Sequence, residues 1–159
     1  CNGIIFNKSA DPKKYLELKQ EIKKHNFLRR NELLLNTDLS YYRMQADWAN
    51  YVNTAEVLLK DYPAKDPEER TFQLNEICWT CFENVEDKAL LAKAVKWAKK
   101  SLDLEDAAFI DTYANLLFKS EEKKGAIKAE EAAIALLKKS PNPSFSLTDA
   151  EAALAKFKQ

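Results

Sequence analysis

The sequence predicts an all-α protein built from repeated helix pairs, and three observations support that fold class. The chain has only two glycines in 159 residues, far below the roughly 7% that is usual in soluble proteins. Apolar residues recur at spacings of three and four along most of the chain, and only the short segment 3–6 alternates as a strand would. In addition, two helix pairs in the second half of the chain are similar to each other at a nearly constant offset.

The composition excludes several classes of function. Lysine and arginine total 25, as do aspartate and glutamate, so we expect neither nucleic acid nor an anionic membrane as the main partner, because both need a basic surface. Gly3 and Gly125 cannot form a phosphate-binding loop, which needs clustered glycines. No apolar run approaches the roughly 20 residues that cross a bilayer. We therefore expect no cofactor and no transmembrane segment.

Helix starts are predicted where an N-cap residue precedes an apolar helical pattern. Asp11 and Asp66 are each followed by proline, which suits the first helical position because its missing N–H has no partner there. Asp47 is a third predicted N-cap. Thr148 and Glu151 have the spacing of a capping box, in which two side chains satisfy the free N–H groups of a helix start reciprocally.

These signals divide the chain into a leader or linker and a single helical domain, over residues 1–10 and 11–159. The domain begins with an N-terminal helix and continues as three helix pairs over about 28–61, 67–102 and 105–139. A final helix over 148–158 is expected to cap the stack, because a repeat protein needs a terminal element with a polar outer face.

The two similar helix pairs predict close packing of antiparallel helices. Residues 94–102 match 126–134 at an offset of 32, and residues 78–82 match 114–118 at an offset of 36, so the earlier pair has a turn four residues longer. Antiparallel helices approach closely only where side chains are small. Three alanines fall twelve and then seven residues apart, the spacing of the small positions of a tetratricopeptide repeat: Ala114, Ala126 and Ala133. We therefore predict a tetratricopeptide-like right-handed helical repeat; the alternative is an irregular all-α bundle with coincidental alanine spacing.

Several segments also resemble a known family. They include Leu-Asn-Glu-Ile-Cys-Trp at 74–79, the run ending in Trp-Ala-Lys-Lys-Ser at 91–101, and Asp-Thr-Tyr-Ala at 111–114. Over about residues 28–139 the chain is similar to the helical repeat region C-terminal to a thioredoxin-like domain in secreted or periplasmic thiol-disulfide isomerase-like proteins of Bacteroidetes-type bacteria. The resemblance implies an accessory module in the bacterial cell envelope, adjacent to a thioredoxin-like domain that is absent from this chain. It implies no activity for the chain itself, although the parent protein would be a thiol-disulfide isomerase or oxidoreductase.

Cys78 and Cys81 form a Cys-x-x-Cys motif, which can mark a dithiol redox centre. Such a centre is activated when its first cysteine lies at a helix N-terminus, where the helix dipole stabilises the thiolate. Here the helix is predicted to begin near residue 67, so Cys78 lies about three turns into it, where the dipole has little effect. Cys78 also aligns with Ala114, which favours two small residues on a packing face. Redox activity of the two thiols stays an alternative.

The remaining cysteine and the single histidine suggest no further chemistry. A zinc site needs four ligands, and the available ones come from three distant segments, so no metal is expected. A cysteine at the start of the chain can be the lipidated residue of a bacterial lipoprotein, but we favour Cys1 as a boundary of the chain over a lipid anchor. His25, beside two lysines at a helix end, is expected to complement the C-terminus of that helix.

A partner-binding groove follows from the repeat alignment. If Cys78 and Ala114 are the small packing positions, the residues three before and one after them face the concave side of the stack. Four side chains then share that face: Asn75, Trp79, Asp111 and Asn115. Tyr41 is a looser candidate. Aromatic rings and amides suit an extended peptide, although Trp79 can equally be a core residue.

Three functions remain open on these observations. The leading hypothesis is a non-catalytic protein-interaction or scaffolding module that holds a peptide or protein segment, or docks on its neighbouring redox domain. The second is dithiol redox activity of Cys78 and Cys81. The third is a purely structural spacer or dimerisation domain. The oligomeric state is open in all three.

Overall fold

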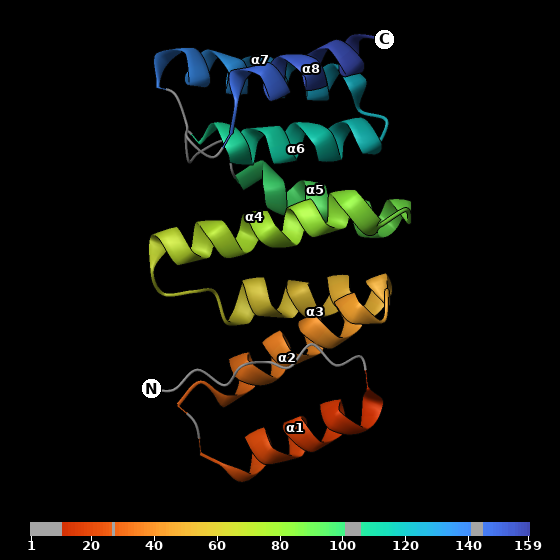
Figure 1. The fold of residues 1–159 in the computed structure, drawn as a ribbon, viewed down its shortest axis with the longest axis vertical. Coiled ribbons are helices and arrows are strands. Elements are labelled where there is room, and N and C mark those ends of the chain that lie inside the picture. The colour runs from red at the N-terminus through yellow and green to blue at the C-terminus, as the bar shows by residue number, and fades with distance from the viewer. Residues whose placement is uncertain (1–10, 27, 101–105, 141–144) are drawn as a thin grey trace. The chain divides into compact units, whose positions relative to one another are not determined.

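The computed structural model describes residues 11–26, 28–100, 106–140 and 145–159, in which all the regular secondary structure is helical (Figure 1). The predicted all-α class is confirmed. Eight helices occur in these residues: α1 (Pro12–Lys24), α2 (Arg30–Met44), α3 (Trp48–Asp61), α4 (Pro67–Asn84), α5 (Lys88–Ala98), α6 (Ala107–Lys119), α7 (Lys123–Lys139) and α8 (Leu147–Lys158). The predicted leader 1–10, the alternating segment 3–6 and Cys1 lie outside the described residues.

The helix starts follow the predicted N-caps, with one correction. The side chains of Asp11, Asp47 and Asp66 each accept a backbone N–H in the first turn, as predicted. The predicted capping box at residues 148–151 is wrong, because Ser146 has the extended backbone of an N-cap and α8 already begins at Leu147. The Ser146 hydroxyl accepts the Asp149 N–H at 3.1 Å and donates to the Asp149 carboxylate at 2.6 Å, so the cap lies two residues earlier than predicted.

Contacts divide the chain into two compact units, Cys1–Pro63 and Ala64–Gln159. We call them unit 1 and unit 2 and describe each by itself. A single domain over residues 11–159 stays a prediction. In unit 1, α2 packs against both α1 and α3. Its core includes Leu39, Val52 and Leu58, and the Tyr15 hydroxyl donates to Asp38 at 2.8 Å to join α1 to α2.

In unit 2, α6 lies between two groups of helices: α4 and α5 are on one side and α7 and α8 on the other (Figure 1). The tightest pairing is that of α6 with α7, where the three alanines of the predicted repeat spacing are completely buried: Ala114, Ala126 and Ala133. In the corresponding α4–α5 pair, the Cys78 thiol lies 3.8 Å from the Ala94 carbonyl oxygen. Small residues therefore lie at both helix contacts, at the positions that the internal alignment paired.

Two further features complete unit 2. Helix α5 ends at Ala98, before the predicted end near residue 102, and residues 99 and 100 form a tighter 3₁₀ turn of the kind common at helix ends. Residues 101–105 lie outside the described residues. At the other end of the unit, α8 packs on α7 and α6. Its Phe157 is completely buried and stacks on Phe118 of α6, with the ring centroids 4.6 Å apart.

Candidate functional site

Two aromatic side chains lie on the exposed face of α4. Trp79 is 37% exposed and Phe72 is 67% exposed, and they are the large hydrophobic residues that the described part of unit 2 leaves open to solvent. Seven residues along a helix amount to two turns, so both rings lie on one side of α4, about 10 Å apart along its axis. Because aromatic rings are usually buried, this face is the first candidate for contact with a partner.

The end of α4 is held in place by a contact from α6. The Trp79 ring lies 5.0 Å from the Phe82 ring, measured between centroids, at 52°. Lys119, the last residue of α6, donates to the Phe82 carbonyl oxygen at 2.7 Å and pairs with the Glu86 carboxylate at 2.7 Å. Its ammonium group also lies 6.0 Å from the centroid of the Phe82 ring. The backbone and ring that support Trp79 are therefore fixed relative to α6.

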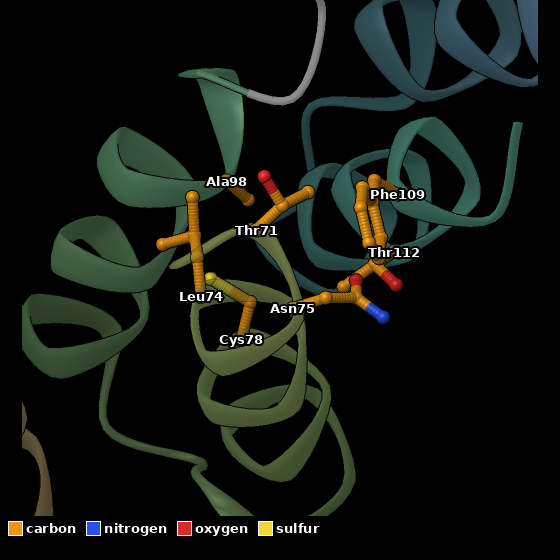
Figure 2. Close-up of a pocket in the computed structure, with 7 residues that line it drawn as sticks. All are labelled: Thr71, Leu74, Asn75, Cys78, Ala98, Phe109 and Thr112. Carbon is orange, nitrogen blue, oxygen red and sulfur yellow. The ribbon is translucent and has the colours of Figure 1, made fainter. Parts of the chain in front are cut away.

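Asn75 lies in a small pocket between α4, α5 and α6. Figure 2 shows its amide directed toward Thr112 of α6, while the Cys78 sulfur is directed toward Leu74. Phe109 lines the same pocket. The enclosed space is about 10 Å³, at the lower limit for a single water molecule. The pocket therefore cannot hold a small-molecule ligand, and Asn75 is half-buried in a helix contact.

The two predicted groove residues of α6 are largely covered. Asp111 is 7% exposed and Asn115 is 9% exposed. The Asn115 amide donates to the Asp111 side-chain oxygen Oδ1 and to its carbonyl oxygen, both at 3.0 Å. Asn115 therefore satisfies Asp111 within one helix, and neither side chain offers much surface to a peptide. Of the four predicted groove residues, Trp79 alone is open to solvent.

Tyr41 lies in α2 of unit 1. Its ring stacks on Tyr15 of α1, with centroids 3.8 Å apart and planes 8° from parallel. It also meets Tyr42 edge-on at 5.8 Å. This tyrosine cluster joins the first two helices of unit 1, so a packing role accounts for Tyr41 within its own unit.

Glu130 of α7 is a titratable residue that the sequence reasoning missed. It is 0% exposed, and neither of its carboxyl oxygens accepts a hydrogen bond from a group that the structure describes. It faces Asp111 across the α6–α7 contact. Two ionised carboxylates can only accept hydrogen bonds, so the contact becomes favourable when one of the two holds a proton. The sequence did contain a signal for the burial of Glu130, because helical spacing places this residue on the inward side of α7, between Ala126 and Ala133.

Burial and mutual repulsion shift the pKa values of this pair. Burial, the charge of Asp111 and a hydrogen bond with Asp111, in decreasing order of effect, together raise the pKa of Glu130 to about 8. Burial also raises the pKa of Asp111, while hydrogen bonds with Glu130 and Asn115 oppose that rise. The charge of Asp149, at the start of α8, adds to the rise at Asp111. The two carboxyl groups therefore share one proton near neutral pH and titrate as a pair.

Both cysteines of the Cys-x-x-Cys motif are buried in the α4 packing face as free thiols. Burial raises the pKa of Cys78 far above its usual range, and the neighbouring Cys81 adds to the rise. Burial raises the pKa of Cys81 to about 12, although the charge of Lys119 partly opposes this. A thiolate is the reactive form of cysteine, so this surrounding disfavours dithiol chemistry.

We expect the two buried thiols to react slowly with a disulfide reagent at neutral pH. In a Cys1→Ser background, the folded chain should react at least roughly 100-fold more slowly than the chain in denaturant, because both thiolate formation and access are suppressed. The measurement is stopped-flow absorbance with an aromatic disulfide. Two rapidly reacting equivalents in the folded state would instead favour the dithiol hypothesis.

The described residues offer no other obvious chemical centre. They contain no group of three or more histidine, cysteine, aspartate or glutamate side chains arranged to hold a metal ion. The ring of His25, at the end of α1, contacts the Glu21 carboxylate at 2.9 Å. Among the helices of the described ranges, none is both long and apolar enough to cross a bilayer.

Comparisons with protein families, characterised proteins and solved structures found no match to this chain. The candidate site therefore depends on the geometry of α4 and its neighbours.

Proposed function

We propose that the chain is a non-catalytic protein-interaction module whose contact surface is the exposed side of α4, centred on Trp79. The observation that supports this most directly is the pair of exposed aromatic rings, Trp79 and Phe72, on one side of a helix whose opposite side is packed. Large aromatic side chains that remain open to solvent are typical anchors of protein interfaces. Trp79 is also held by Phe82, so little conformational freedom is lost on binding.

The proposal narrows the predicted groove. Asn75 lies at the edge of the proposed contact surface. Asp111 and Asn115 are covered and belong to the packing of α6 against α7. A tetratricopeptide-like stack is part of the proposal, because small residues lie at equivalent contacts in both helix pairs of unit 2. A setting in the bacterial cell envelope, beside a thioredoxin-like domain, is also a proposal and rests on the sequence resemblance alone.

The two alternative functions have less support. Dithiol activity needs an accessible thiolate, whereas Cys78 and Cys81 are buried and their pKa values are raised. A purely structural spacer leaves the two exposed aromatic rings without a role. Light scattering of the purified chain measures directly whether it dimerises through the same rings.

Removal of the Trp79 ring tests the proposal. Peptides selected from a random display library on the wild-type chain should bind at least roughly 10-fold more weakly to Trp79→Ala, because an interface anchor contributes most of the binding energy. Trp79→Phe should retain most of the affinity. Binding is measured by fluorescence anisotropy, and thermal unfolding is recorded for every variant.

Lys128→Ala, on an exposed position of α7, is the control and should bind as the wild type does. If Trp79→Ala unfolds the chain, Phe72→Ala replaces it, because that ring is exposed enough to be removed without disturbing the core. The proposal fails if no peptide is enriched, or if folded alanine variants at both positions bind as tightly as the wild type.

A further inference from the structure

The exposed side of α4 has a definite charge as well as aromatic rings. Its outward positions follow one another at spacings of three and four and are all exposed: Glu69, Phe72, Glu76, Trp79 and Glu83. At 100° per residue these five positions fall within an arc of about 80°. We call this surface the acidic–aromatic face. Carboxylates and rings alternate along it, over about 21 Å of helix.

No basic side chain of α4 lies on this face. The only one in the helix is Arg70, which is directed away from it and donates to the carbonyl oxygens of Ala64 and Lys65 before the helix. Glu68 adds a further carboxylate at the start of α4. The chain as a whole is neutral, so the negative charge of this helix is a local property.

Two cations close to the C-terminal end of α4 are engaged elsewhere. Lys119 is largely covered and is held by the Phe82 carbonyl oxygen and the Glu86 carboxylate. Lys88, at the start of α5, pairs with Glu121 at 3.0 Å. Neither interaction uses the carboxylates of Glu69 or Glu83. The carboxylates of Glu69 and Glu83, at the two ends of the acidic–aromatic face, are therefore not neutralised by these two lysines.

Aromatic rings flanked by carboxylates recognise cations in two ways. A guanidinium or ammonium group is attracted to the face of a tryptophan or phenylalanine ring, and the same group pairs with a carboxylate at its side. Trp79 has Glu83 one turn ahead of it, and Phe72 has Glu69 one turn behind it. Each end of the face thus combines a ring and a carboxylate within reach of one basic side chain.

We propose that the acidic–aromatic face binds a basic segment of another protein, with two arginine or lysine side chains that each engage one ring and its adjacent carboxylate. This inference rests on the proposed function and specifies the class of its partner. The two ring positions lie about 10 Å apart, which is about three residues of an extended chain. The segment therefore has basic residues about three positions apart.

Labelled peptides of equal length test the basic character of the partner. One carries two arginines three residues apart, the second has glutamine at those positions, and the third has glutamate. Fluorescence anisotropy should show the arginine peptide binding at least roughly 10-fold more tightly than the glutamine peptide at low salt. This difference should shrink as ionic strength rises, because exposed charge pairs are screened.

Charge removal from the face is the matched test. The double variant Glu69→Gln/Glu83→Gln should bind the arginine peptide only as well as the wild type binds the glutamine peptide. Glu131→Gln, which removes an exposed carboxylate from α7, should change nothing. Trp79→Ala should weaken binding of every peptide, because the ring contributes apolar contact to each of them.

The outcomes separate this inference from the proposed function. If the arginine and glutamine peptides bind equally and both need Trp79, the interaction surface stands and the basic partner is wrong. If none of the three designed peptides binds while a library peptide binds through Trp79, the basic partner is wrong and the interaction surface stands; if no library peptide is enriched either, both are wrong. If light scattering shows self-association that Glu69→Gln/Glu83→Gln abolishes, the face binds a second copy of the chain and the inference of a separate partner is overturned.

Discussion

Replacement of Phe157 by alanine should lower the free energy of unfolding of unit 2 by about 3–5 kcal/mol, the range for loss of a buried aromatic side chain. Phe157 is completely buried and stacks on Phe118, so the smaller side chain leaves a cavity between α8 and α6. The fully buried Ala150 of the same core has only a methyl side chain, which cannot fill this space. Urea unfolding in a Trp48→Phe background measures the change, because the remaining tryptophans, Trp79 and Trp97, both lie in unit 2.

The matched control is Phe72→Ala, which removes the same side chain from an exposed position. Phe72 is mostly open to solvent, so its loss should change the free energy of unfolding by no more than about 0.5 kcal/mol. A similar loss of stability in both variants would contradict the assignment of Phe157 to the core and of Phe72 to the surface. It would also remove the main argument for α8 as the element that closes the α6–α7 face.

Replacement of Glu130 by glutamine should stabilise unit 2 at pH 8 by about 1–3 kcal/mol, because it removes a buried group that is costly when ionised. The glutamine amide has nearly the same shape and can donate to Asp111. Urea unfolding across the pH range from 5 to 9 measures the effect. A loss of stability at every pH would contradict the assignment of a shared proton.

The same pair predicts how stability depends on pH. The folded state raises the pKa of Glu130 from 4.5 to about 8, so within that interval the folded chain holds a proton that the unfolded chain releases. The contribution of protonated Glu130 to the free energy of unfolding is therefore fully present below about pH 4.5. It is lost as the pH rises toward 8, by roughly 1 kcal/mol per pH unit. Glu130→Gln should flatten this slope.

Glu131→Gln is the neighbouring control. Glu131 is half-exposed and pairs with Lys158 of α8 at 2.9 Å, so its neutralisation should cost no more than about 1 kcal/mol and should leave the slope unchanged. If both variants flatten the pH dependence of the free energy of unfolding equally, that dependence reflects the overall charge of α7. The carboxyl pair would then have no special role.

Much of the local structure could be predicted because it depends on short-range chemistry. The caps at Asp11, Asp47 and Asp66 follow from a side-chain oxygen that satisfies free N–H groups at a helix start. The predictions of the end of α5 and of the start of α8 were less accurate. At the start of α8, both Ser146 and Thr148 can act as a cap, and only the path of the folded chain selects one of them.

The candidate site was predicted in part. The repeat alignment placed Trp79, one residue after the small position Cys78, on the concave side of the stack, and the structure leaves its ring partly open to solvent. The same rule placed Asp111 and Asn115 on an equivalent side of α6, where the structure covers them. Periodicity says which residues share a side of a helix, but not which helix lies against it.

What the sequence by itself determined is therefore the all-α class, most helix starts and the small residues at helix contacts, because caps, breakers and side-chain size act within a few residues. Only the tertiary structure decided that Glu130 is buried opposite Asp111, that the two cysteines are enclosed, and that Trp79 stays exposed. The physical reason is that burial and pKa depend on which helices pack together, and neighbours distant in sequence supply the desolvation and the charges.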